Sequence, residues 1–576
     1  MNTLVIVLIA AVCLFGAYTL YGRWLANKWG IDPTAKTPAV VHEDGRDYVP
    51  TNGWTVFAHQ FSSIAGAGPV TGAIQAAAFG WLPVLLWVLL GGIFFGAVTD
   101  FGALYASVKN DGKSMGMLIE KYIGKTGRKL FLLFCWLFCG IVIAAFADMV
   151  AGTFNAFDAE GAQVEAAFTN GAAGMVSIMF MVFAVVFGFI QKKFNFSGWR
   201  EAIIGIVFIV LSFAVGMNCP LVFGKAAWSY ITFVYIFFAA VLPMWMLKQP
   251  RDYMTTFMFG AMIAGAVIGL LVAHPTMNLP VFTGFNNAKL GTMFPILFVT
   301  VACGAVSGFH SLVSSGTSSK TVENEKDMLK VGYGAMVLES LLAVLALCVA
   351  GAAAAADGTP ATGTPFQIFS RGVAGFFEMF GVPVSIATVF MTMCVSALAL
   401  TSLDAVARIG RMSFQELFSV DDMEHAEGWR KLCCNVYFST FITLVFGFIL
   451  TQIGYANIWP LFGSANQLLS ALVLATLCVF LKVTGRNNKM LFPPLVIMLC
   501  VTFTALVQRL IAMVKAISAA ASTAIPAGET TWGAVFIANG LQLILAVLLI
   551  VLGLNIVFHS VKSYTTCDAS EAKATV

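Results

Sequence analysis

Residues 57–72 read Phe57-Ala-His-Gln-Phe-Ser-Ser-Ile-Ala-Gly-Ala-Gly-Pro-Val-Thr-Gly72. This apolar stretch brings Gly66, Gly68 and Pro69 within four residues, and Gly72 follows one turn later. A proline inside a helix removes a backbone donor and clashes with the preceding turn, and glycine makes unwinding easier. We therefore expect a helix that is interrupted at these residues.

The composition around this stretch is that of a membrane protein. Of the 576 residues, 59% are hydrophobic and 10% are charged, whereas about 25% of the residues of a soluble domain are charged. Apolar runs recur that are long enough to cross roughly 30 Å of hydrocarbon, and they predict an all-α, polytopic membrane protein of about fifteen transmembrane helices. The candidate spans are 3–22, 55–79, 81–107, 130–156, 172–191, 202–219, 226–247, 254–274, 294–318, 332–356, 382–402, 432–454, 461–481, 491–508 and 532–558.

The distribution of lysine and arginine tests these spans independently. Alternate loops hold 27 of the 32 basic residues. Positive residues resist translocation, so these loops are expected in the cytoplasm, with the N-terminus outside and the C-terminus inside. The stretch 359–381 is the weakest point of the count, because it contains Arg371 and Glu378 and can instead be an interfacial helix. The basic loops are 23–54, 108–129, 191–201, 248–253, 319–331, 403–431, 482–489 and the tail after 559.

An interrupted helix at membrane depth has a chemical use. Unwound backbone is tolerated there only inside protein or beside a water-filled cavity, where carbonyls bind cations and a half-helix N-terminus binds an anionic group. Close packing of two helices is the alternative use of glycine, but it does not account for a proline beside Gly68. The substrate-binding residues expected here are Ser62, Ser63, Gly66, Ala67, Gly68 and Pro69.

A second segment of this kind lies in the other half of the chain. It reads Phe298-Val-Thr-Val-Ala-Cys-Gly-Ala-Val-Ser-Gly-Phe-His-Ser-Leu-Val-Ser-Ser-Gly-Thr-Ser-Ser319, apolar at first and then rich in serine, glycine and threonine. Two interrupted segments in the two halves of a chain are the best sequence indication of a transporter site. The substrate-binding residues expected in this segment are Gly304, Ser307, Gly308 and His310.

Hydroxyls and charges lie close together in Ala399-Leu-Thr-Ser-Leu-Asp-Ala-Val-Ala-Arg408. Thr401 and Ser402 offer two hard oxygen ligands near the inner end of a span. The alternative is that they bond to carbonyls of the preceding turn, as mid-helix hydroxyls often do. Asp404 and Arg408 are four residues apart, so they share a helix face and can form an ion pair.

Three acidic residues fall inside predicted spans, where a central charge costs roughly 2.5–3.5 kcal/mol on insertion scales. Asp148 is the best-placed proton carrier, because it lies deep in its span. Asp100 lies near the cytoplasmic end of its span, so we expect it to pair with a lysine or arginine of a loop. Glu339 fits a structural and a functional role equally well. His59 and His310 can titrate near neutral pH, or can be hydrogen-bonded fixtures of the site.

Six motifs are spread over residues 47–480. They are Asp47-Tyr-Val-Pro-Thr-Asn52, Ala65-Gly-Ala-Gly-Pro69, Ala302-Cys-Gly-Ala-Val-Ser-Gly-Phe-His-Ser311, Ser314-Ser-Gly-Thr317, Thr401-Ser-Leu-Asp404 and Trp459-Pro-Leu-Phe-Gly-Ser-Ala-Asn-Gln467. Together they resemble the carbon starvation protein A (CstA) family, whose members are regarded as peptide transporters and in some cases take up pyruvate. The family is grouped with the amino acid–polyamine–organocation superfamily, so the resemblance implies a LeuT-like inverted-repeat core with extra helices. We expect one integral membrane domain over 1–576, its core over 55–480 and peripheral helices over 1–22 and 490–558.

The resemblance also implies an ion site. In the LeuT-like architecture the first and sixth core helices are interrupted, and a sodium ion can lie between carbonyls of the first helix and a hydroxyl pair on the eighth. Spans 55–79, 294–318 and 382–402 have the directions that these three helices require. Six spans separate the two interrupted segments where the architecture has four, so two must be insertions. The coupling-ion or proton residues expected are Ala65, Thr401, Ser402, Asp404 and Asp148.

The expected function is uptake of short peptides or small carboxylates such as pyruvate by an ion-coupled symporter in the inner membrane of a bacterium. The coupling ion is sodium or a proton, and no cofactor or other metal is expected, because no Cys/His spacing suits zinc. A channel or a nutrient sensor is the alternative. An intramembrane enzyme is less well supported: the chain has no His-Glu-x-x-His or Gly-x-Ser-x-Gly, and Asp111-Gly-Lys-Ser114 lacks the upstream glycine of a P-loop. A net charge of +4 without basic runs argues against nucleic acid as a partner.

Overall fold

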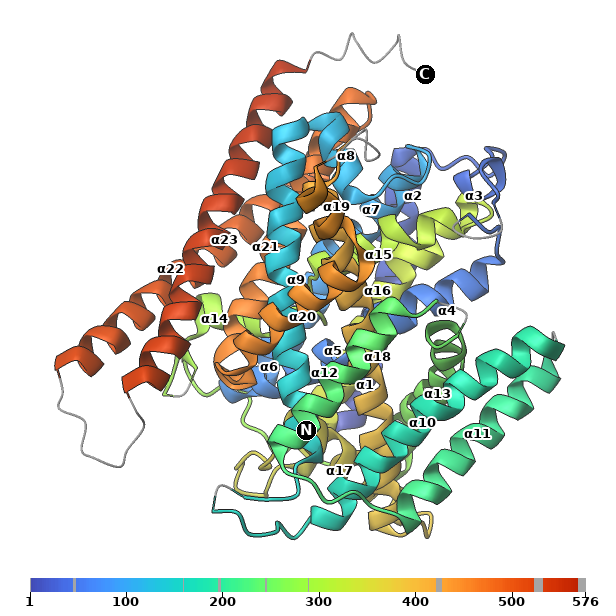
Figure 1. Cartoon of the computed structure of the whole chain (residues 1–576), viewed down its shortest axis with the longest axis vertical. Helices are drawn as coiled ribbons and strands as arrows, with labels where there is room; N and C mark the ends of the chain where they lie inside the picture. Colours follow the sequence, from blue (N-terminus) through green and yellow to red (C-terminus); the bar gives the residue numbers. More distant parts are fainter. Residues whose placement is uncertain are drawn as a thin grey trace.

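The computed structural model describes residues 2–44, 48–158, 160–194, 198–243, 246–288, 290–420, 427–522 and 532–567. Residues 45–47 and 421–426 of the predicted cytoplasmic loops lie outside these ranges. Within them, the only strands are the two-residue β1 (Asn286–Asn287) and β2 (Gly291–Thr292), which pair antiparallel. Helices make up nearly all the regular structure, so the predicted all-α class is confirmed (Figure 1).

The helices follow the apolar runs of the sequence. Their bounds are α1 (Thr3–Ala17), α2 (Arg23–Trp29), α3 (Pro38–Val41), α4 (Gly53–Ile64), α5 (Ala67–Ala76), α6 (Trp81–Gly91), α7 (Ala97–Val108), α8 (Met115–Tyr122), α9 (Lys125–Phe154), α10 (Ala167–Phe194), α11 (Trp199–Asn218), α12 (Lys225–Val241), α13 (Lys248–Ala273), α14 (Met293–Thr300), α15 (Gly308–Gly316), α16 (Ala335–Ala353), α17 (Pro365–Glu378), α18 (Val384–Phe418), α19 (Gly428–Cys434), α20 (Val436–Thr451), α21 (Tyr455–Val483), α22 (Phe492–Ser522) and α23 (Trp532–Thr566). Short π-helical turns at Tyr18–Gly22, Gly92–Gly96 and Lys330–Gly334 join α1 to α2, join α6 to α7 and lead into α16.

Eleven helices in the described part of the chain are long and apolar enough to cross a membrane, or twelve if α19 and α20, bent by 69°, make one span. The remaining predicted spans fall on α12, which is shorter, and on the interrupted pairs α4–α5 and α14–α15. The polytopic prediction is confirmed, whereas the count of fifteen stays a prediction. The stretch 359–381 holds α17, a helix of 14 residues that is too short to span.

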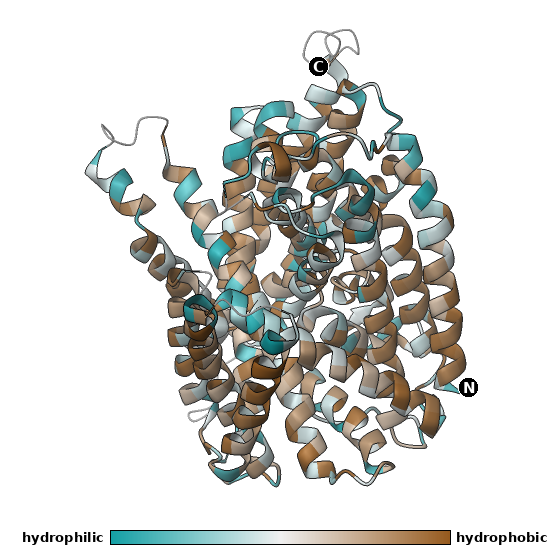
Figure 2. Ribbon diagram, turned by 90° about the vertical axis from the view of Figure 1, so that its right-hand side faces the viewer, coloured by the Kyte–Doolittle hydropathy of each residue, from teal (hydrophilic) through white to brown (hydrophobic). Residues whose placement is uncertain are grey.

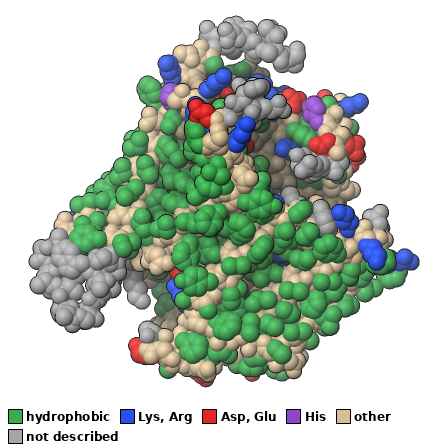
Figure 3. Space-filling view, in the orientation of Figure 1, with side chains coloured by type: hydrophobic (Ala, Val, Ile, Leu, Met, Phe, Trp, Pro, Cys, Tyr) green, Lys and Arg blue, Asp and Glu red, His purple; other side chains and the backbone are tan. Residues whose placement is uncertain are grey.

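The helices separate into a packed interior and a surface layer. In the apolar stretches of α21 and α9, 100% and 83% of the residues are buried, whereas in those of α1 and α11 only 28% and 22% are buried. The α10–α11 hairpin lies at one side of the molecule, and α22 with α23 forms a pair at another (Figure 1). Hydrophobic residues line the middle of the helices, and hydrophilic residues gather toward the upper end (Figure 2). A broad face of hydrophobic side chains, with charges mainly along its upper edge, suits a lipid surround (Figure 3).

The first predicted interruption is confirmed. Helix α4 ends at Ile64, where Ala65 (φ −73°, ψ 58°) and Gly66 (φ −79°, ψ −152°) leave the helical conformation. Helix α5 begins again at Ala67. Pro69 lies in its first turn, where the missing N–H is one that a helix leaves unpaired in any case.

The second predicted interruption is also confirmed. Helix α14 ends at Thr300, and α15 begins at Gly308 after seven non-helical residues, 301–307. The two interrupted helices lie side by side. A methyl group on Gly72 of α5 would be 2.7 Å from the Thr300 carbonyl oxygen, and one on Gly304 would be 3.5 Å from the Cα of Pro69. The long helix α18 packs across both halves of the first interrupted helix.

Candidate functional site

A small cavity lies where the two interrupted helices meet. Its volume is about 20 Å³, little more than one water molecule needs, so no peptide or pyruvate fits until the helices around it move. Aromatic and aliphatic side chains form most of its wall, and a serine, an asparagine and a cysteine add polar atoms. The wall consists of Ile64, Gly66, Gly68, Phe138, Val142, Phe146, Cys303, Phe309, Ser402, Val406, Phe462 and Asn466.

The N-terminus of α5 opens on this cavity without a cap. Its N-cap residue, Gly66, has no side chain that could accept a hydrogen bond from the N–H groups of the first turn. Among the described residues, the N–H groups of Ala67 and Gly68 donate no hydrogen bond. Unpaired N–H groups at a buried helix start carry partial positive charge, and they suit a carboxylate. Gly66 and Gly68, both predicted to bind substrate, lie in the cavity wall.

The N-terminus of α15 is held by Asn466 of α21. Its side-chain oxygen accepts a hydrogen bond from the Phe309 N–H at 3.1 Å. Its amide nitrogen lies 3.0 Å from the Ser307 hydroxyl and 3.4 Å from the Cys303 sulfur. Gln467 and Trp459, which also lie on α21, hold α14, the other half of this interrupted helix. They donate to carbonyls of α14 at 2.6 and 3.2 Å. Sequence reasoning did not select Asn466, although it stands in a quoted motif and is a buried amide in an apolar helix.

The two hydroxyls of α18 differ in their surroundings. The Thr401 hydroxyl donates to the Ala397 carbonyl at 2.8 Å, so the alternative of bonding to the preceding turn holds for this residue. Ser402 instead lines the cavity, and a methyl group on Gly66 would overlap its hydroxyl oxygen. The unwound backbone at Ala65 and Gly66 therefore lies against Ser402, and the structure brings these three predicted residues together.

Several other predicted residues lie outside the cavity wall. Ser62 donates to the His59 carbonyl at 3.2 Å, and Ser63 is half-buried beside it. Ala67 and Pro69 are buried in the first turn of α5. The remaining ones belong to the second interruption. A methyl group on Gly304 would press on Ala343, and one on Gly308 would press on the backbone of α21. The Ser307 hydroxyl bonds to Asn466.

His310 points away from the cavity into a buried cluster of three titratable groups. Its Nδ1 lies 3.0 Å from Oδ2 of Asp100 on α7, and its Nε2 lies 3.3 Å from Oε2 of Glu339 on α16. All three side chains are 0% exposed. The expectation that Asp100 pairs with a loop lysine or arginine is wrong: the path of α7 brings it against the interrupted helix. Sequence reasoning could not have found this cluster, because 210 residues separate Asp100 from His310.

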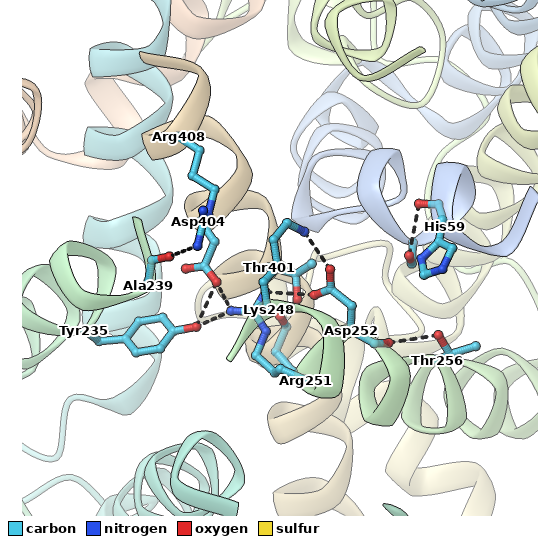
Figure 4. A network of polar contacts seen from close by, with 12 residues as sticks. His59, Tyr235, Ala239, Lys248, Arg251, Asp252, Thr256, Thr401, Asp404 and Arg408 are labelled. Carbon is cyan, nitrogen blue, oxygen red and sulfur yellow. Dashed lines mark hydrogen bonds and ion pairs between the residues drawn. The ribbon is translucent and has the colours of Figure 1, made fainter. Parts of the chain in front are cut away.

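Asp404 belongs to a second buried network, between α12, α13 and α18 (Figure 4). It forms an ion pair with Arg251 and accepts a hydrogen bond from the Tyr235 hydroxyl at 3.0 Å. Arg251 also donates to Asp252 at 2.9 Å, and Lys248 donates to Asp252 at 2.6 Å. Arg251 is 1% exposed and Asp404 is 0% exposed. The network ties α12, α13 and α18 together.

The predicted ion pair between Asp404 and Arg408 is not formed. Arg408 donates instead to the carbonyls of Ala239 and Leu242 at the end of α12, as Figure 4 shows for Ala239. The free carbonyls at a helix C-terminus attract a cation, and the closer Arg251 takes the carboxylate. Arg251 was assigned to a cytoplasmic loop because α13 starts earlier than the apolar run.

Asp148 lies apart from the cavity. Its carboxylate forms an ion pair with Lys225 at 2.8 Å and accepts the Tyr455 N–H, at the start of α21, at 2.8 Å. The Lys225 side chain is 47% exposed. An ion pair with a lysine and a hydrogen bond from a helix N-terminus give this carboxylate a structural role. Its role as a proton carrier stays a prediction.

A larger cavity, of about 500 Å³, lies between two predicted cytoplasmic loops. Charged side chains of both signs line it, and it adjoins the start of α4. Its polar lining and its distance from the helix breaks separate it from the small cavity. The lining residues are Pro33, Thr34, Ala35, Lys36, Val40, Asn52, Gly53, Trp54, Glu323, Asn324, Lys326, Asp327 and Lys330.

Known proteins resemble this chain over most of its length. A family model described as carbon starvation protein CstA matches residues 2–363 and 350–505. The peptide transporter CstA of Escherichia coli K12 is 31% identical over 584 residues, covering 87% of this chain and 80% of the relative. The pyruvate/proton symporter BtsT of the same strain is 36% identical over 360 residues, covering 60% and 48%.

Solved structures give more distant likenesses. A manganese transporter of Eremococcus coleocola, in complex with an aromatic bis-isothiourea substituted compound, is 10% identical with a TM-score of 0.46, covering 90% of this chain and 99% of that one. MhsT in complex with L-phenylalanine is 13% identical with a TM-score of 0.44, covering 88% and 99%. The assignment of this chain to a family therefore rests on the sequence relatives and not on these solved structures.

Proposed function

This chain belongs to the carbon starvation protein CstA family, and we propose that it is an ion-coupled secondary transporter that takes up short peptides or small carboxylates such as pyruvate. The two relatives described above are named as a peptide transporter and as a pyruvate/proton symporter. Peptides and pyruvate differ in size and shape, but both carry a carboxylate. A transporter of either substrate therefore needs a site that binds a carboxylate.

One observation carries the proposal: the uncapped N-terminus of α5 opens on the small cavity. The N–H groups of Ala67 and Gly68 donate no hydrogen bond to any described residue, and Ser402 adds a hydroxyl on the facing helix. A carboxylate placed there would gain backbone hydrogen bonds and the favourable field of the helix start. The aromatic wall then suits a short apolar remainder such as a methyl group.

The size of the cavity supports alternating access. At about 20 Å³ the site is shut, so a substrate enters only when helices part on one side. The breaks at residues 65–66 and 301–307 let each half-helix tilt separately, because no continuous backbone ladder stiffens them. We place the N-terminus outside and the C-terminus in the cytoplasm, as the loop charges require, in the inner membrane of a bacterium.

The coupling ion remains sodium or a proton within this proposal. For sodium, the ligands proposed are the Ala65 carbonyl with the hydroxyls of Thr401 and Ser402. The Thr401 oxygen keeps its lone pairs for a cation while it donates to Ala397. Asp404 is proposed to act on this site through the charge network, rather than as a ligand, since Arg251 occupies its carboxylate.

Counterflow in proteoliposomes tests the function. Vesicles loaded with unlabelled pyruvate or dialanine should accumulate the same labelled solute without any ion gradient. An imposed inward gradient of sodium or of protons should then drive uphill accumulation, which a channel cannot produce. The absence of counterflow for both solutes would refute the proposal. Counterflow without gradient-driven accumulation would indicate a facilitator.

A further inference from the structure

We propose that Asp100, His310 and Glu339 form the proton-binding site that couples transport to a proton gradient. The inference rests on the proposed function and chooses between the two coupling ions left open there. The three residues come from α7, α15 and α16, and only the second of them belongs to an interrupted helix. The cluster therefore joins the half-helix that borders the cavity to two uninterrupted neighbours.

The geometry of the cluster leaves room for protons to be shared. His310 bridges the two carboxylates with its two ring nitrogens, at 3.0 Å to Asp100 and 3.3 Å to Glu339. One oxygen of Asp100 and both oxygens of Glu339 are buried without a well-aligned hydrogen-bond partner in the described structure. Buried carboxylate oxygens normally find donors, and a carboxyl group that is protonated carries no charge, so it tolerates the missing donors better than a carboxylate does.

The charges of the cluster make protonation obligatory in the closed structure. Two ionised carboxylates beside a neutral imidazole carry a net charge of −2, and a protonated His310 still leaves −1. No lysine or arginine forms an ion pair with Asp100 or Glu339 within the described residues. Among the described residues, the thiol of Cys303 is a further titratable group beside the two carboxyl groups. A buried, uncompensated charge is costly, so the closed cluster is neutral and its three side chains share two dissociable protons.

A bound metal does not fit this arrangement. The two ring nitrogens of His310 lie on opposite edges of the imidazole, so one ion cannot reach the ring and both carboxylates. No grouping of three histidine, cysteine, aspartate or glutamate side chains in the described part of the chain could hold a metal ion. A proton is the cation that this cluster accepts.

The cluster is connected to the substrate site through two adjacent residues of α15. Phe309 lines the cavity, and the next residue, His310, enters the cluster. The Phe309 N–H is also the group that Asn466 holds. Any displacement of α15 therefore changes the cavity wall and the spacing of the cluster together.

This connection gives an order of events. A proton taken from the outer solution neutralises the cluster and allows α15 to close on the bound carboxylate. After the site opens inward, release of one proton to the cytoplasm leaves a charge of −1, which favours hydration of the cluster and keeps α15 displaced. One proton moves with one substrate, so uptake of a monoanion is electroneutral.

The test compares gradient-driven accumulation with counterflow in the same proteoliposomes. For one proton per monoanion, a pH difference of one unit supports about tenfold accumulation of pyruvate. Glu339→Gln keeps the shape of the side chain but removes the titrating group, and Asp100→Asn does the same on the other side. Each variant should lose this accumulation, to a ratio near one, and should keep counterflow. Glu416→Gln, in a partly exposed pair with Arg128 far along α18, is the matched control and should accumulate as the wild type does.

The outcomes separate the inference from the proposed function. Loss of counterflow in the wild type would refute transport itself. Wild-type counterflow with accumulation that follows sodium and ignores protons would overturn the proton site, without any need for a variant. Proton-driven accumulation that survives in Glu339→Gln and Asp100→Asn, or that is lost instead in Asp148→Asn, would also overturn it. If the cluster is only structural, the variants should lose counterflow and accumulation in parallel.

Discussion

A single methyl group at Gly68 should weaken the binding of substrate. A Cβ there would lie 2.5 Å from the sulfur and 2.6 Å from the Cβ of Cys303, whereas ordinary contact begins at 3.4 Å. Both clashing atoms belong to the unwound segment of the other interrupted helix, so the two breaks would be forced apart in the closed state. Overpacking of this kind costs about 1–3 kcal/mol. If the whole cost falls on the closed, substrate-bound state, Gly68→Ala should weaken pyruvate or peptide affinity by about 5- to 150-fold.

The assay is the concentration dependence of counterflow in proteoliposomes, with the amount of inserted protein measured for each variant. Cys303→Gly removes both clashing atoms, so the double variant Gly68→Ala/Cys303→Gly should recover affinity, whereas Cys303→Ala leaves the Cβ clash and should recover less. Gly260→Ala on α13, where an added Cβ meets nothing within 4 Å, is the matched control. Wild-type affinity in Gly68→Ala, or no recovery in the double variant, would refute the reasoning.

Three further changes have defined outcomes. Gly66→Ala should abolish counterflow, because its methyl group would overlap the Ser402 hydroxyl, and Ser402→Ala in the same chain should restore part of it. Arg251→Met should lower stability by about 3–5 kcal/mol, since Asp404 is left buried and unpaired, and adding Asp404→Leu should recover most of this loss in thermal unfolding of the purified protein. Asp148→Asn should lower stability by only about 1 kcal/mol in the same assay, because its lysine partner is half-exposed; a loss as large as that of the arginine variant would contradict this assignment.

The breaks in the helices were predictable because their causes are local. Glycine and proline change backbone preferences at their own positions, so an interruption near Gly66–Pro69 and a second one within residues 298–319 could be predicted without any knowledge of their neighbours. The membrane class followed from composition in the same way. The count of spans was harder, since length and hydropathy identify α12 and the interrupted pairs less clearly than continuous helices.

Contacts between distant helices were not predictable. Sequence spacing suggested that Asp404 pairs with Arg408, four residues away, but the tertiary fold supplies Arg251 from 153 residues away. Likewise, Asp100 and Glu339 appeared as separate intramembrane acids, and only the fold places both against His310. Asn466 was overlooked for a related reason: a single amide in an apolar run shows its use only when the carbonyl and N–H groups of another helix face it.

The ion pair between Arg251 and Asp404 also bears on how the protein is made. Ribosomes add about 5–20 residues per second, so the 153 residues between the two partners take roughly 8–30 s to synthesise. During that interval the Arg251 guanidinium lacks the carboxylate of Asp404. Arg251 lies in the first turn of α13, however, and its long side chain can reach the aqueous interface. Helix α13 can settle at its final depth only after α18 has emerged. The packing of α13 against α18 is therefore completed late, and a chain truncated before residue 404 should be recognised as incomplete by membrane quality control.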